Sequence, residues 1–190
     1  KAKGTSLDGR RVVVSGSGNV AIYAIEKAAQ LGGTCVACSD SDGIVVDEAG
    51  IDLELLKQVK EVERGRLTSY AERRGSARYI EDGRIWEVPC DVALPCATQN
   101  ELNHADAMAR NGCVVVAEGA NMPTTPDGVR VLMDAGVLFA PGKAANAGGV
   151  ATSALEMQQN ASRDSWSFAQ SEEKLAEIMR AIHERCADTA

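Results

Sequence analysis

A glycine-rich turn is the first feature of the chain whose residue types could bind a ligand. The segment Gly16-Ser-Gly18-Asn-Val-Ala21 follows the β-branched run Val12–Ser15 and opens a helical segment. Gly16 permits a tight turn, Gly18 lets the backbone approach a pyrophosphate, and Ala21 allows close packing of helix on strand. Free N–H groups at the start of that helix would face the phosphates. The pattern indicates dinucleotide binding, with a glycine-rich turn that binds nothing as the alternative.

An acidic residue at the end of the next predicted strand supports this interpretation. Asp40 follows the strand Thr34–Ser39, about twenty residues beyond the glycines, where a ribose-binding acid belongs. Asp40 would accept hydrogen bonds from a free ribose 2′-OH, which favours NAD. Ser41 can instead donate to a 2′-phosphate whose charge Arg64 or Arg66 neutralises, which favours NADP. These residues alone leave the two coenzymes equally favoured.

Polar residues also follow two later predicted strands. Ala97 and Thr98 lie just past a strand expected at Asp91–Leu94, and Asn121 lies just past one at Val114–Ala117. Ligands of open parallel sheets bind outside the carboxyl ends of the strands. Thr98 and Asn121 are therefore candidate contacts to ribose or nicotinamide, although either can instead be a helix cap or a turn residue.

A segment rich in glycine and alanine follows the last predicted strand. It spans residues 142–150 and suits a close approach to a ligand better than a packed core. Asn146, within it, is a candidate partner for a carboxamide.

The elements that must position these residues alternate between short apolar runs and amphipathic helices. Strands are expected at 12–15, 34–39, 77–80, 91–94, 114–117 and 137–139, and helices at 21–31, 52–63, 67–74, 99–110 and 124–135. This alternation predicts a doubly wound α/β domain, with a mostly parallel Rossmann-type sheet covered by helices on both faces. Two further helices, at 144–161 and from Ser171 onward, either pack back on the sheet or reach towards a domain that is absent. We therefore expect a dinucleotide-binding domain at 1–163 and a helical extension at 164–190.

Composition argues against several functional classes. Hydrophobic residues make up 45% of the 190 residues, which excludes a disordered chain, and the net charge of −7 argues against nucleic-acid binding. No apolar run approaches the ~20 residues of a membrane-spanning helix. No leader precedes the first strand, so we expect a cytoplasmic protein. His104 and His183 lie far apart in sequence, so no metal site is expected.

The six cysteines are expected to be buried thiols rather than a disulfide framework. The pair Cys35-Val-Ala-Cys38 has the spacing of a redox motif but lies within a predicted strand. Positions three apart on a regular strand point to opposite faces. We therefore expect neither a redox nor a metal role for this pair.

Four segments together resemble the glutamate dehydrogenases, most closely their bacterial, hexameric, NADP-linked branch. The likeness runs from about Asp8 to about Cys186 and covers only the family's coenzyme-binding domain. The segments are Ser15-Gly-Ser-Gly-Asn-Val-Ala21, Leu94-Pro-Cys-Ala-Thr-Gln-Asn-Glu-Leu102, Ala117-Glu-Gly-Ala-Asn-Met-Pro-Thr-Thr125 and Gly142-Lys-Ala-Ala-Asn-Ala-Gly-Gly-Val-Ala-Thr-Ser153.

This resemblance implies a role for each candidate site residue. The residues implied to hold the coenzyme are Ser15, Gly16, Gly18, Asn19, Val20, Asp40, Ser41, Arg64, Ala97, Thr98, Asn121 and Asn146. Ser15–Ala21 would hold the pyrophosphate, and Asp40 and Ser41 the adenosine ribose with its 2′-phosphate. Thr98 and Asn121 would contact the ribose on the nicotinamide side, and Asn146 the carboxamide. Val150 and Ser153 would reach into the substrate cleft, where Ser153 would bond the distal carboxylate of glutamate.

The resemblance also implies a reaction and a division of labour. The reaction is the reversible oxidative deamination of L-glutamate to 2-oxoglutarate and ammonia, with hydride transfer to NADP (NAD as the alternative), in a homohexamer. The family's catalytic lysine and aspartate belong to a preceding domain that is absent here. We therefore expect no catalytic residue in this chain, which alone should be inactive and monomeric or weakly associated.

One position departs from the family's pattern, and two other functions stay open. Glu63 stands where the resemblance leads us to expect a lysine against the 2′-phosphate, with Arg64 beside it. A dehydrogenase for another amino acid is the first alternative. Ser153 argues against it, because dehydrogenases for branched-chain or aromatic amino acids are apolar at that position. A non-catalytic nucleotide-sensing module is the second alternative.

Overall fold

The chain begins with the strand, turn and helix that the sequence predicts. In the computed structural model, which describes residues 6–103 and 105–189, β1 (Arg11–Val14) leads through the glycine turn into α1 (Asn19–Gln30). Ile22 and Ile25 of α1 are buried against the sheet. Gly32 ends the helical segment with a φ of +85°, a conformation that glycine adopts without strain.

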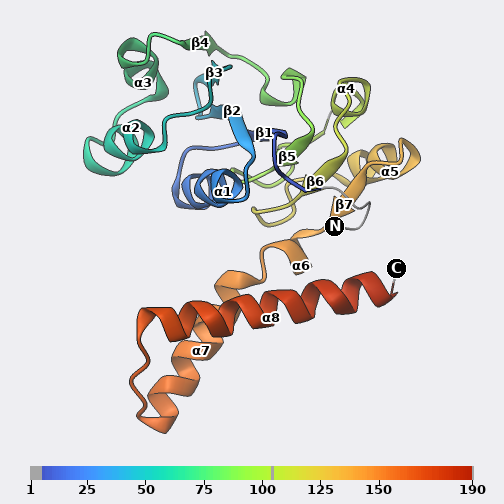
Figure 1. The fold of residues 1–190 in the computed structure, drawn as a ribbon. Coiled ribbons are helices and arrows are strands. Elements are labelled where there is room, and N and C mark those ends of the chain that lie inside the picture. The colour runs from blue at the N-terminus through green and yellow to red at the C-terminus, as the bar shows by residue number, and fades with distance from the viewer. Residues whose placement is uncertain (1–5, 104, 190) are drawn as a thin grey trace.

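Within residues 6–103 and 105–189, seven strands form one sheet in the order β4-β3-β2-β1-β5-β6-β7 (Figure 1). Besides β1, they are β2 (Thr34–Ser39), β3 (Gly43–Asp47), β4 (Ala77–Glu81), β5 (Val92–Leu94), β6 (Val115–Ala117) and β7 (Leu138–Ala140). Strands β1, β2, β5, β6 and β7 run parallel to one another. The expectation of a mostly parallel α/β sheet is therefore confirmed.

Strand β3 is absent from the elements expected from the sequence, and that omission is wrong. β3 is antiparallel to both of its neighbours, β2 and β4. Residues 40–43 form a tight hairpin in which the backbone N–H of Asp40 donates to the carbonyl of Gly43 at 3.0 Å. An Asp-Gly pair next to a β-branched run is a hairpin signal, but the expectation of strands separated by helices passes over it.

Helices cover the two faces of the sheet, which confirms the doubly wound architecture. On one face lie α1, α2 (Leu53–Lys57) with the π-helical turn η1 (Gln58–Val62) that continues it, and α3 (Leu67–Arg73). On the other lie α4 (Ala105–Arg110), α5 (Pro126–Asp134) and the short 3₁₀ turn η2 (Ile85–Glu87). Each face has its own apolar cluster, with Tyr70 the largest fully buried side chain of the first and Met108 and Leu132 prominent in the second.

Helix α4 is shorter than the helix expected at 99–110. The backbone N–H of Asn100 donates to the carbonyl of Met122, and that of Leu102 to the carbonyl of Pro123. These bonds tie the segment to the loop after β6, and Leu102 forms an isolated bridge with Thr124. Tertiary pairing thus replaces the first turns of the expected helix. His104 lies outside the described residues.

A β-bulge changes the expected orientation of the cysteine pair in β2. The register of β1 against β2 shifts by one residue between Val12 and Val13. As a result, Cys35 and Cys38 both belong to the apolar cluster beneath α1, whereas the intervening Val36 belongs to the opposite one. The expectation that the two cysteines point to opposite faces is wrong. The expectation of buried thiols is confirmed, since Cys35 and Cys38 are both buried and unpaired in the described structure.

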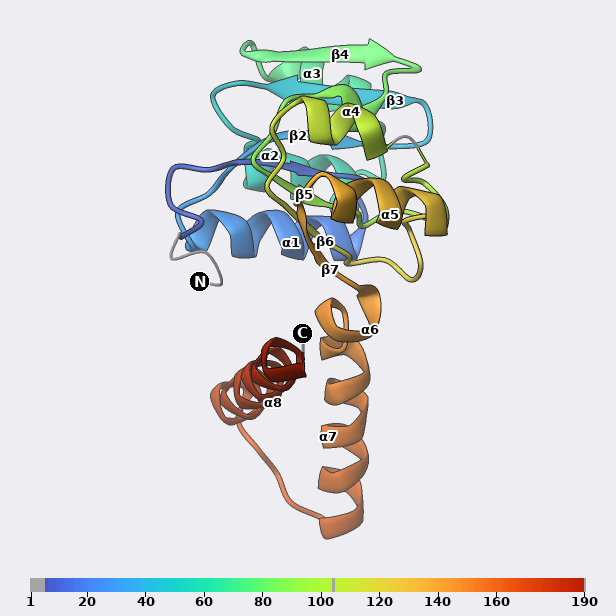
Figure 2. The same ribbon diagram turned by 90° about the vertical axis from the view of Figure 1, so that its right-hand side faces the viewer.

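The last three helices leave the sheet. They are α6 (Gly142–Ala145), α7 (Gly148–Ser162) and α8 (Phe168–Thr189), so α8 starts three residues earlier than expected. Helices α7 and α8 pack against each other and project away from the sheet (Figure 2). Of the two expected placements, reaching away from the sheet is the one observed. Among the described residues, no helix is both long and apolar enough to cross a membrane.

Candidate functional site

The glycine turn lies where the connections of β1 and β5 depart in opposite directions, which is the switch point of the sheet. Gly16 has a φ of +83°, and its backbone N–H donates to the hydroxyl of Ser39 at 2.8 Å. A Cβ added at Gly16 would lie 3.3 Å from the Cβ of Ala97, in the loop after β5. Gly16 therefore permits both the backbone conformation and the close approach of the two loops.

The amino end of α1 faces open space above this turn. Gly18 is the residue that precedes the helix, and no side chain of the described residues caps the helix there. A Cβ added at Gly18 would meet no atom within 4 Å. Asn19 and Val20, in the first helical turn, are exposed. Unpaired N–H groups beside an open space of this kind suit a phosphate, so the local geometry fits a dinucleotide's pyrophosphate.

Ser15 is fully buried beneath the turn, and its hydroxyl already has partners. The Oγ of Ser15 accepts the backbone N–H of Cys96 at 2.8 Å, and the hydroxyl also hydrogen-bonds the carboxyl group of Glu101. Ser15 therefore joins the loop after β1 to the loop after β5, rather than facing the open space.

Glu101 is a site residue that the sequence reasoning missed. Its Oε1 accepts the backbone N–H groups of Ala97 at 3.1 Å and Thr98 at 3.2 Å. Burial raises the pKa of Glu101, although these hydrogen bonds act in the opposite direction. Glu101 thus fixes the loop whose exposed residues were predicted to contact the coenzyme. A signal for it was available, since it is the acid within the segment Leu94–Leu102.

The hairpin after β2 brings together the residues predicted at the adenosine end. The side chain of Arg66 donates to the Oγ of Ser41 at 2.6 Å and forms an ion pair with Asp42 at 3.3 Å. One carboxylate oxygen of Asp40 accepts the backbone N–H of Asp42, and the other accepts that of Leu67, at the start of α3. Asp40 therefore shapes the hairpin and holds α3 against it.

The side chain of Arg64, in contrast to that of Arg66, is not hydrogen-bonded to Ser41 in the described part of the chain. Arg64 has a φ of +53° and is exposed, and among the described residues no hydrogen bond or ion pair involves its side chain. Its neighbour Glu63 turns to Arg73, which donates to both carboxylate oxygens at 2.7 Å. These bonds lower the pKa of Glu63 to about 2. Of the two arginines named at this end, the structure brings Arg66 to Ser41.

At the nicotinamide end, two predicted residues meet directly. The side-chain amide of Asn146 donates to the Oδ1 of Asn121 at 2.9 Å and to the carbonyl of Ala120 at 3.0 Å. Asn121 follows β6 and Asn146 follows α6, so the contact joins two strand-end loops. Thr98 is exposed on the loop held by Glu101.

Glu118 is a second residue that the sequence reasoning missed. It directly follows β6, is 5% exposed, and accepts the backbone N–H of Gly142 at 2.6 Å and that of Thr124 at 3.2 Å. A buried carboxylate with two such partners fixes the segments that carry Asn121 and Asn146. Its position in the motif Ala117–Thr125 was visible, and Thr124 lies in the same motif, but Gly142 is 24 residues further along the chain.

The two residues predicted at the substrate lie on the first turns of α7. Both Val150, at 77% exposure, and Ser153 are exposed, and in the described part of the chain no hydrogen bond links them to the residues predicted to hold the coenzyme. Their helix starts beyond α6, on the same side as the carboxyl edge of the sheet (Figure 2).

Comparisons with known proteins agree with this geometry. The family model described as Glutamate/Leucine/Phenylalanine/Valine dehydrogenase matches residues 1–190. A glutamate dehydrogenase of Bacteroides thetaiotaomicron is 55% identical over 98% of this chain and 43% of its own length. An NAD(P)-specific glutamate dehydrogenase of Xylanibacter ruminicola is 52% identical over 98% of this chain and 43% of its own length. An NADP-specific glutamate dehydrogenase of Salmonella typhimurium is also 52% identical, over 99% of this chain and 43% of its own length.

A solved structure has the same fold. The crystal structure of Plasmodium falciparum glutamate dehydrogenase superimposes with a TM-score of 0.93 and 42% identity, covering 97% of this chain and 41% of that one. The chain therefore spans less than half the length of the relatives it matches. Because the family model matches residues 1–190 of this chain, the chain belongs to the glutamate/leucine/phenylalanine/valine dehydrogenase family.

Proposed function

We propose that this chain is the coenzyme-binding domain of a glutamate dehydrogenase that interconverts L-glutamate with 2-oxoglutarate and ammonia. One observation carries the proposal. The uncapped amino end of α1 faces open space beside Gly18, at the switch point of a doubly wound sheet. Dinucleotides bind open α/β sheets at this place, and the similar proteins are glutamate dehydrogenases.

The coenzyme is NADP. The hydroxyl of Ser41 and the guanidinium of Arg66 lie together at the hairpin after β2, and such a donor pair suits a ribose 2′-phosphate. The specificity of the Salmonella relative supports the same choice. NAD is the alternative, since the Xylanibacter relative is described as NAD(P)-specific.

The strand-end loops orient the nicotinamide. Thr98 and Asn121 contact its ribose, and Asn146 bonds its carboxamide, so that the ring faces the substrate. The bound coenzyme supplies the hydride chemistry, and the chain supplies orientation. Val150 and Ser153 border the substrate, and the hydroxyl of Ser153 suits the distal carboxylate of glutamate.

The rest of the protein carries the proton chemistry. The relatives are more than twice as long as this chain, and the part without a counterpart here would supply the catalytic groups and most contacts of a homohexamer. The chain alone is then inactive, monomeric or weakly associated, with residues 1–163 binding the coenzyme and 164–190 extending that domain. We place the enzyme in the cytoplasm, for which the five buried free thiols are the support.

A pair of titrations of this chain tests the proposal. NADPH and NADH are each added at one fixed salt concentration, and binding is followed by nicotinamide fluorescence. We expect NADPH to bind about tenfold more tightly than NADH, a difference of about 1.4 kcal/mol. Tighter binding of NADH would assign the protein to the NAD-linked enzymes. Binding of neither would overturn the proposed site.

A second assay tests the division of labour. The chain is mixed with L-glutamate and NADP, and absorbance of the reduced coenzyme is recorded. No reduction is expected, because the chain holds only the coenzyme. Measurable glutamate-dependent reduction would contradict the proposal that the catalytic groups lie elsewhere.

A further inference from the structure

Two cysteines stand at equivalent places on neighbouring parallel strands. Cys90 lies two positions before the first residue of β5, and Cys113 lies two positions before the first residue of β6. The register of the two strands pairs Val92 with Val115, and the same offset pairs Cys90 with Cys113. Backbone bonds continue the pairing in front of the strands, since the carbonyl of Asp91 accepts the N–H group that follows Cys113 at 2.8 Å.

The two side chains are buried in one apolar cluster. Cys90 is 6% exposed and Cys113 is 5% exposed, and both pack on the face of the sheet that carries α4 and α5. The Sγ of Cys113 also lies 3.3 Å from the carbonyl of Val115, to which it donates. Neighbouring strands lie about 4.8 Å apart, a spacing within the range of Cα separations that a disulfide spans. The backbone geometry therefore permits a covalent bond between these sulfurs.

Either cysteine can serve as the nucleophile. The thiolate is the reactive form in thiol chemistry, and the strand pairing places Cys90 and Cys113 opposite each other. The second thiol is therefore positioned to attack a mixed disulfide formed at the first.

The other buried cysteines differ from this pair. Burial raises the pKa of Cys35 to about 12 and holds that of Cys38 well above its usual value. Among the described residues, no hydrogen bond joins these two thiols to each other. Cys35 and Cys38 lie three positions apart on one strand, and thus provide an internal comparison of buried thiols that are not paired across neighbouring strands.

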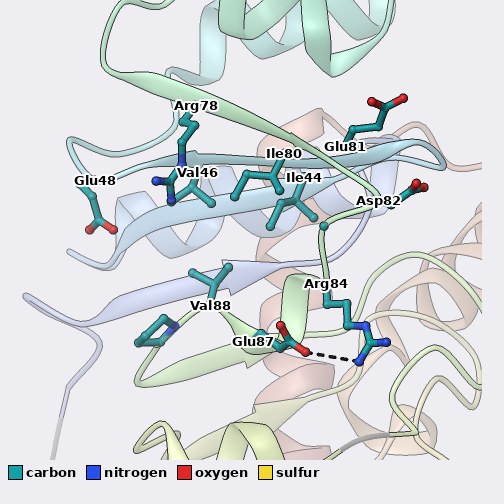
Figure 3. Close-up of a pocket in the computed structure, with 12 residues that line it drawn as sticks. Ile44, Val46, Glu48, Arg78, Ile80, Glu81, Asp82, Arg84, Glu87 and Val88 are labelled. Atoms are coloured by element: carbon teal, nitrogen blue, oxygen red, sulfur yellow. Dashed lines mark hydrogen bonds and ion pairs between the residues drawn. The ribbon is translucent and has the colours of Figure 1, made fainter.

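A surface cavity brings solvent close to Cys90. The cavity, of about 510 Å³, lies over β3 and β4, with Ile44, Val46 and Ile80 on its floor (Figure 3). Glu87, Val88 and Pro89 form another side of it, and Pro89 is the residue directly before Cys90. The cavity therefore reaches the sequence neighbour of Cys90, while Cys90 and Cys113 themselves lie behind its lining residues in the apolar cluster.

We propose that Cys90 and Cys113 are a redox-active dithiol that forms an intrachain disulfide on reaction with a low-molecular-weight disulfide. The thiolate of one cysteine attacks one sulfur of the reagent and releases the other half as a thiolate, which takes up a proton. The second cysteine then loses its proton and attacks the sulfur of the first, which releases the second half of the reagent as a thiol. One reagent disulfide is reduced to two thiols for each protein disulfide formed, so the electrons and protons balance.

The disulfide constrains a segment of the coenzyme domain. It closes the loop from Cys90 to Cys113, which contains β5, the loop of Thr98 and α4. Closing a loop of this length stabilises the folded chain relative to its unfolded state. The bond lies at the amino ends of the strands, whereas the coenzyme residues follow the carboxyl ends. Oxidation therefore raises thermal stability without occupying the coenzyme site.

The test uses this chain with the substitution Cys186→Ser, which removes the exposed cysteine and with it disulfides between molecules. The chain is incubated with oxidised glutathione, denatured, and its free thiols are counted. Peptides are then mapped by mass spectrometry without reduction. We expect two thiols to be lost, a linked peptide pair containing Cys90 and Cys113, and a higher Tm that dithiothreitol reverses.

Two substitutions provide the comparison. Cys113→Val should abolish the linked peptide pair, and Cys38→Ala should leave it unchanged. The mapping of the parent chain needs neither variant to fold, so the proposal stays testable if one of them does not. An unchanged thiol count, or a disulfide that joins Cys35 to Cys38 instead, would overturn the proposal.

Discussion

The buried carboxylate of Glu118 accepts the backbone amide of Gly142 at 2.6 Å. Its other oxygen accepts the amide of Thr124, so one side chain joins the end of β6 to the start of α6 and to the segment before α5. Asn121 and Asn146 lie in these two connected segments and bond to each other. The placement of the predicted nicotinamide contacts therefore depends on an acid whose described hydrogen bonds go to backbone amides and not to either asparagine.

Glu118→Gln should lower both stability and coenzyme affinity. The glutamine amide presents N–H groups where one backbone N–H now needs an acceptor, and an unsatisfied buried donor costs about 1–3 kcal/mol. Urea unfolding measures the stability, and NADPH titration measures the affinity. The control is Glu87→Gln, whose exposed ion pair with Arg84 should be worth under about 0.5 kcal/mol. Equal losses in the two variants would contradict the role given to Glu118.

Alanine substitutions at Gly16 and Gly18 should separate folding from binding. Gly16→Ala forces a φ of +83° on a residue with a Cβ and presses it against Ala97, so it should destabilise the chain by about 2 kcal/mol. Gly18→Ala meets no protein atom and should change stability by less than about 1 kcal/mol. It should nevertheless weaken NADPH binding at least tenfold, by placing a methyl group where the pyrophosphate lies. If Gly18→Ala binds NADPH normally, the pyrophosphate does not lie at this helix end.

Local patterns predict the glycine turn and the helix start that follows it, because the residues involved are adjacent in sequence. The β1 run, the turn at Gly16 and the start of α1 form one continuous segment, and each is specified by its own residue types. Glu118 escapes such reasoning because one of its partners, the backbone amide of Gly142, lies 24 residues further along the chain. Glu101 accepts amides only three and four residues before it, but no pattern of residue types marks a loop acid for that role. The hairpin before β3, in contrast, carries a local signal.

The two arginines at the adenosine end illustrate the limit of sequence distance. Arg64 and Arg66 are equally plausible neighbours of Ser41 by sequence alone. Arg64 lies at a φ of +53° after the π-helical turn, whereas Arg66 precedes α3, which Asp40 holds against the hairpin. The choice between them therefore depends on backbone conformation and on a tertiary hydrogen bond.

Arg66→Gln should weaken NADPH binding about tenfold or more and change NADH binding by less than about twofold. The guanidinium charge near Ser41 favours a 2′-phosphate, which only NADPH carries. Arg64→Gln is the matched control, because it removes the same charge two residues away and should have the smaller effect. Titrations at two salt concentrations measure both variants. A larger loss for Arg64→Gln would assign the phosphate contact to Arg64 instead.

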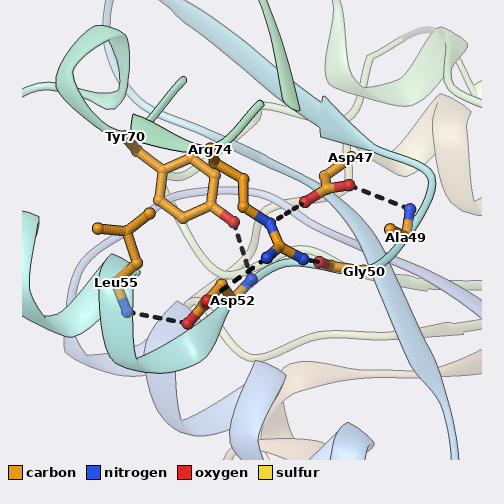
Figure 4. Close-up of polar contacts among 7 residues, drawn as sticks. All are labelled: Asp47, Ala49, Gly50, Asp52, Leu55, Tyr70 and Arg74. Atoms are coloured by element: carbon orange, nitrogen blue, oxygen red, sulfur yellow. Dashed lines mark hydrogen bonds and ion pairs between the residues drawn. The ribbon is translucent and has the colours of Figure 1, made fainter. Parts of the chain in front are cut away.

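The carboxyl-terminal end of α3 is held by an ion pair between Arg74 and Asp47. Arg74 donates to the fully buried Asp47 at 2.9 Å and reaches the carbonyl of Gly50 (Figure 4). The hydroxyl of Tyr70 accepts the backbone N–H of Asp52 at 2.8 Å in the same group. Since Arg66 lies just before α3, this network holds the far end of the helix that positions it.

Arg74→Met should destabilise the chain by about 3–5 kcal/mol, because it leaves the Asp47 carboxylate buried without its charged partner. The measurement is the free energy of unfolding in urea. Arg110→Met, which breaks an exposed pair with Asp106, is the control and should cost under about 1 kcal/mol. The double variant Asp47→Asn with Arg74→Met should recover part of the loss. A cost for Arg74→Met no larger than that of the control would show that the buried pair contributes little.

Glu101 should make the folded chain less stable as the pH rises, whereas an ion-paired acid makes a folded chain more stable as the pH rises. Burial raises its pKa in the folded chain, so the neutral form is favoured by folding. The contribution is fully present below the unfolded value of about 4.3 and is lost as the pH rises through the raised folded value.

Glu101→Gln keeps an oxygen for the amides of Ala97 and Thr98 but cannot ionise. Its stability relative to the parent chain should therefore increase as the pH rises from below 4.3 through the raised pKa, and then level off. Urea unfolding at a series of pH values measures this difference. Glu81→Gln, on the exposed surface of β4, should give a curve that follows the parent across the same range. A constant difference between Glu101→Gln and the parent at every pH would mean that folding does not raise the pKa of Glu101.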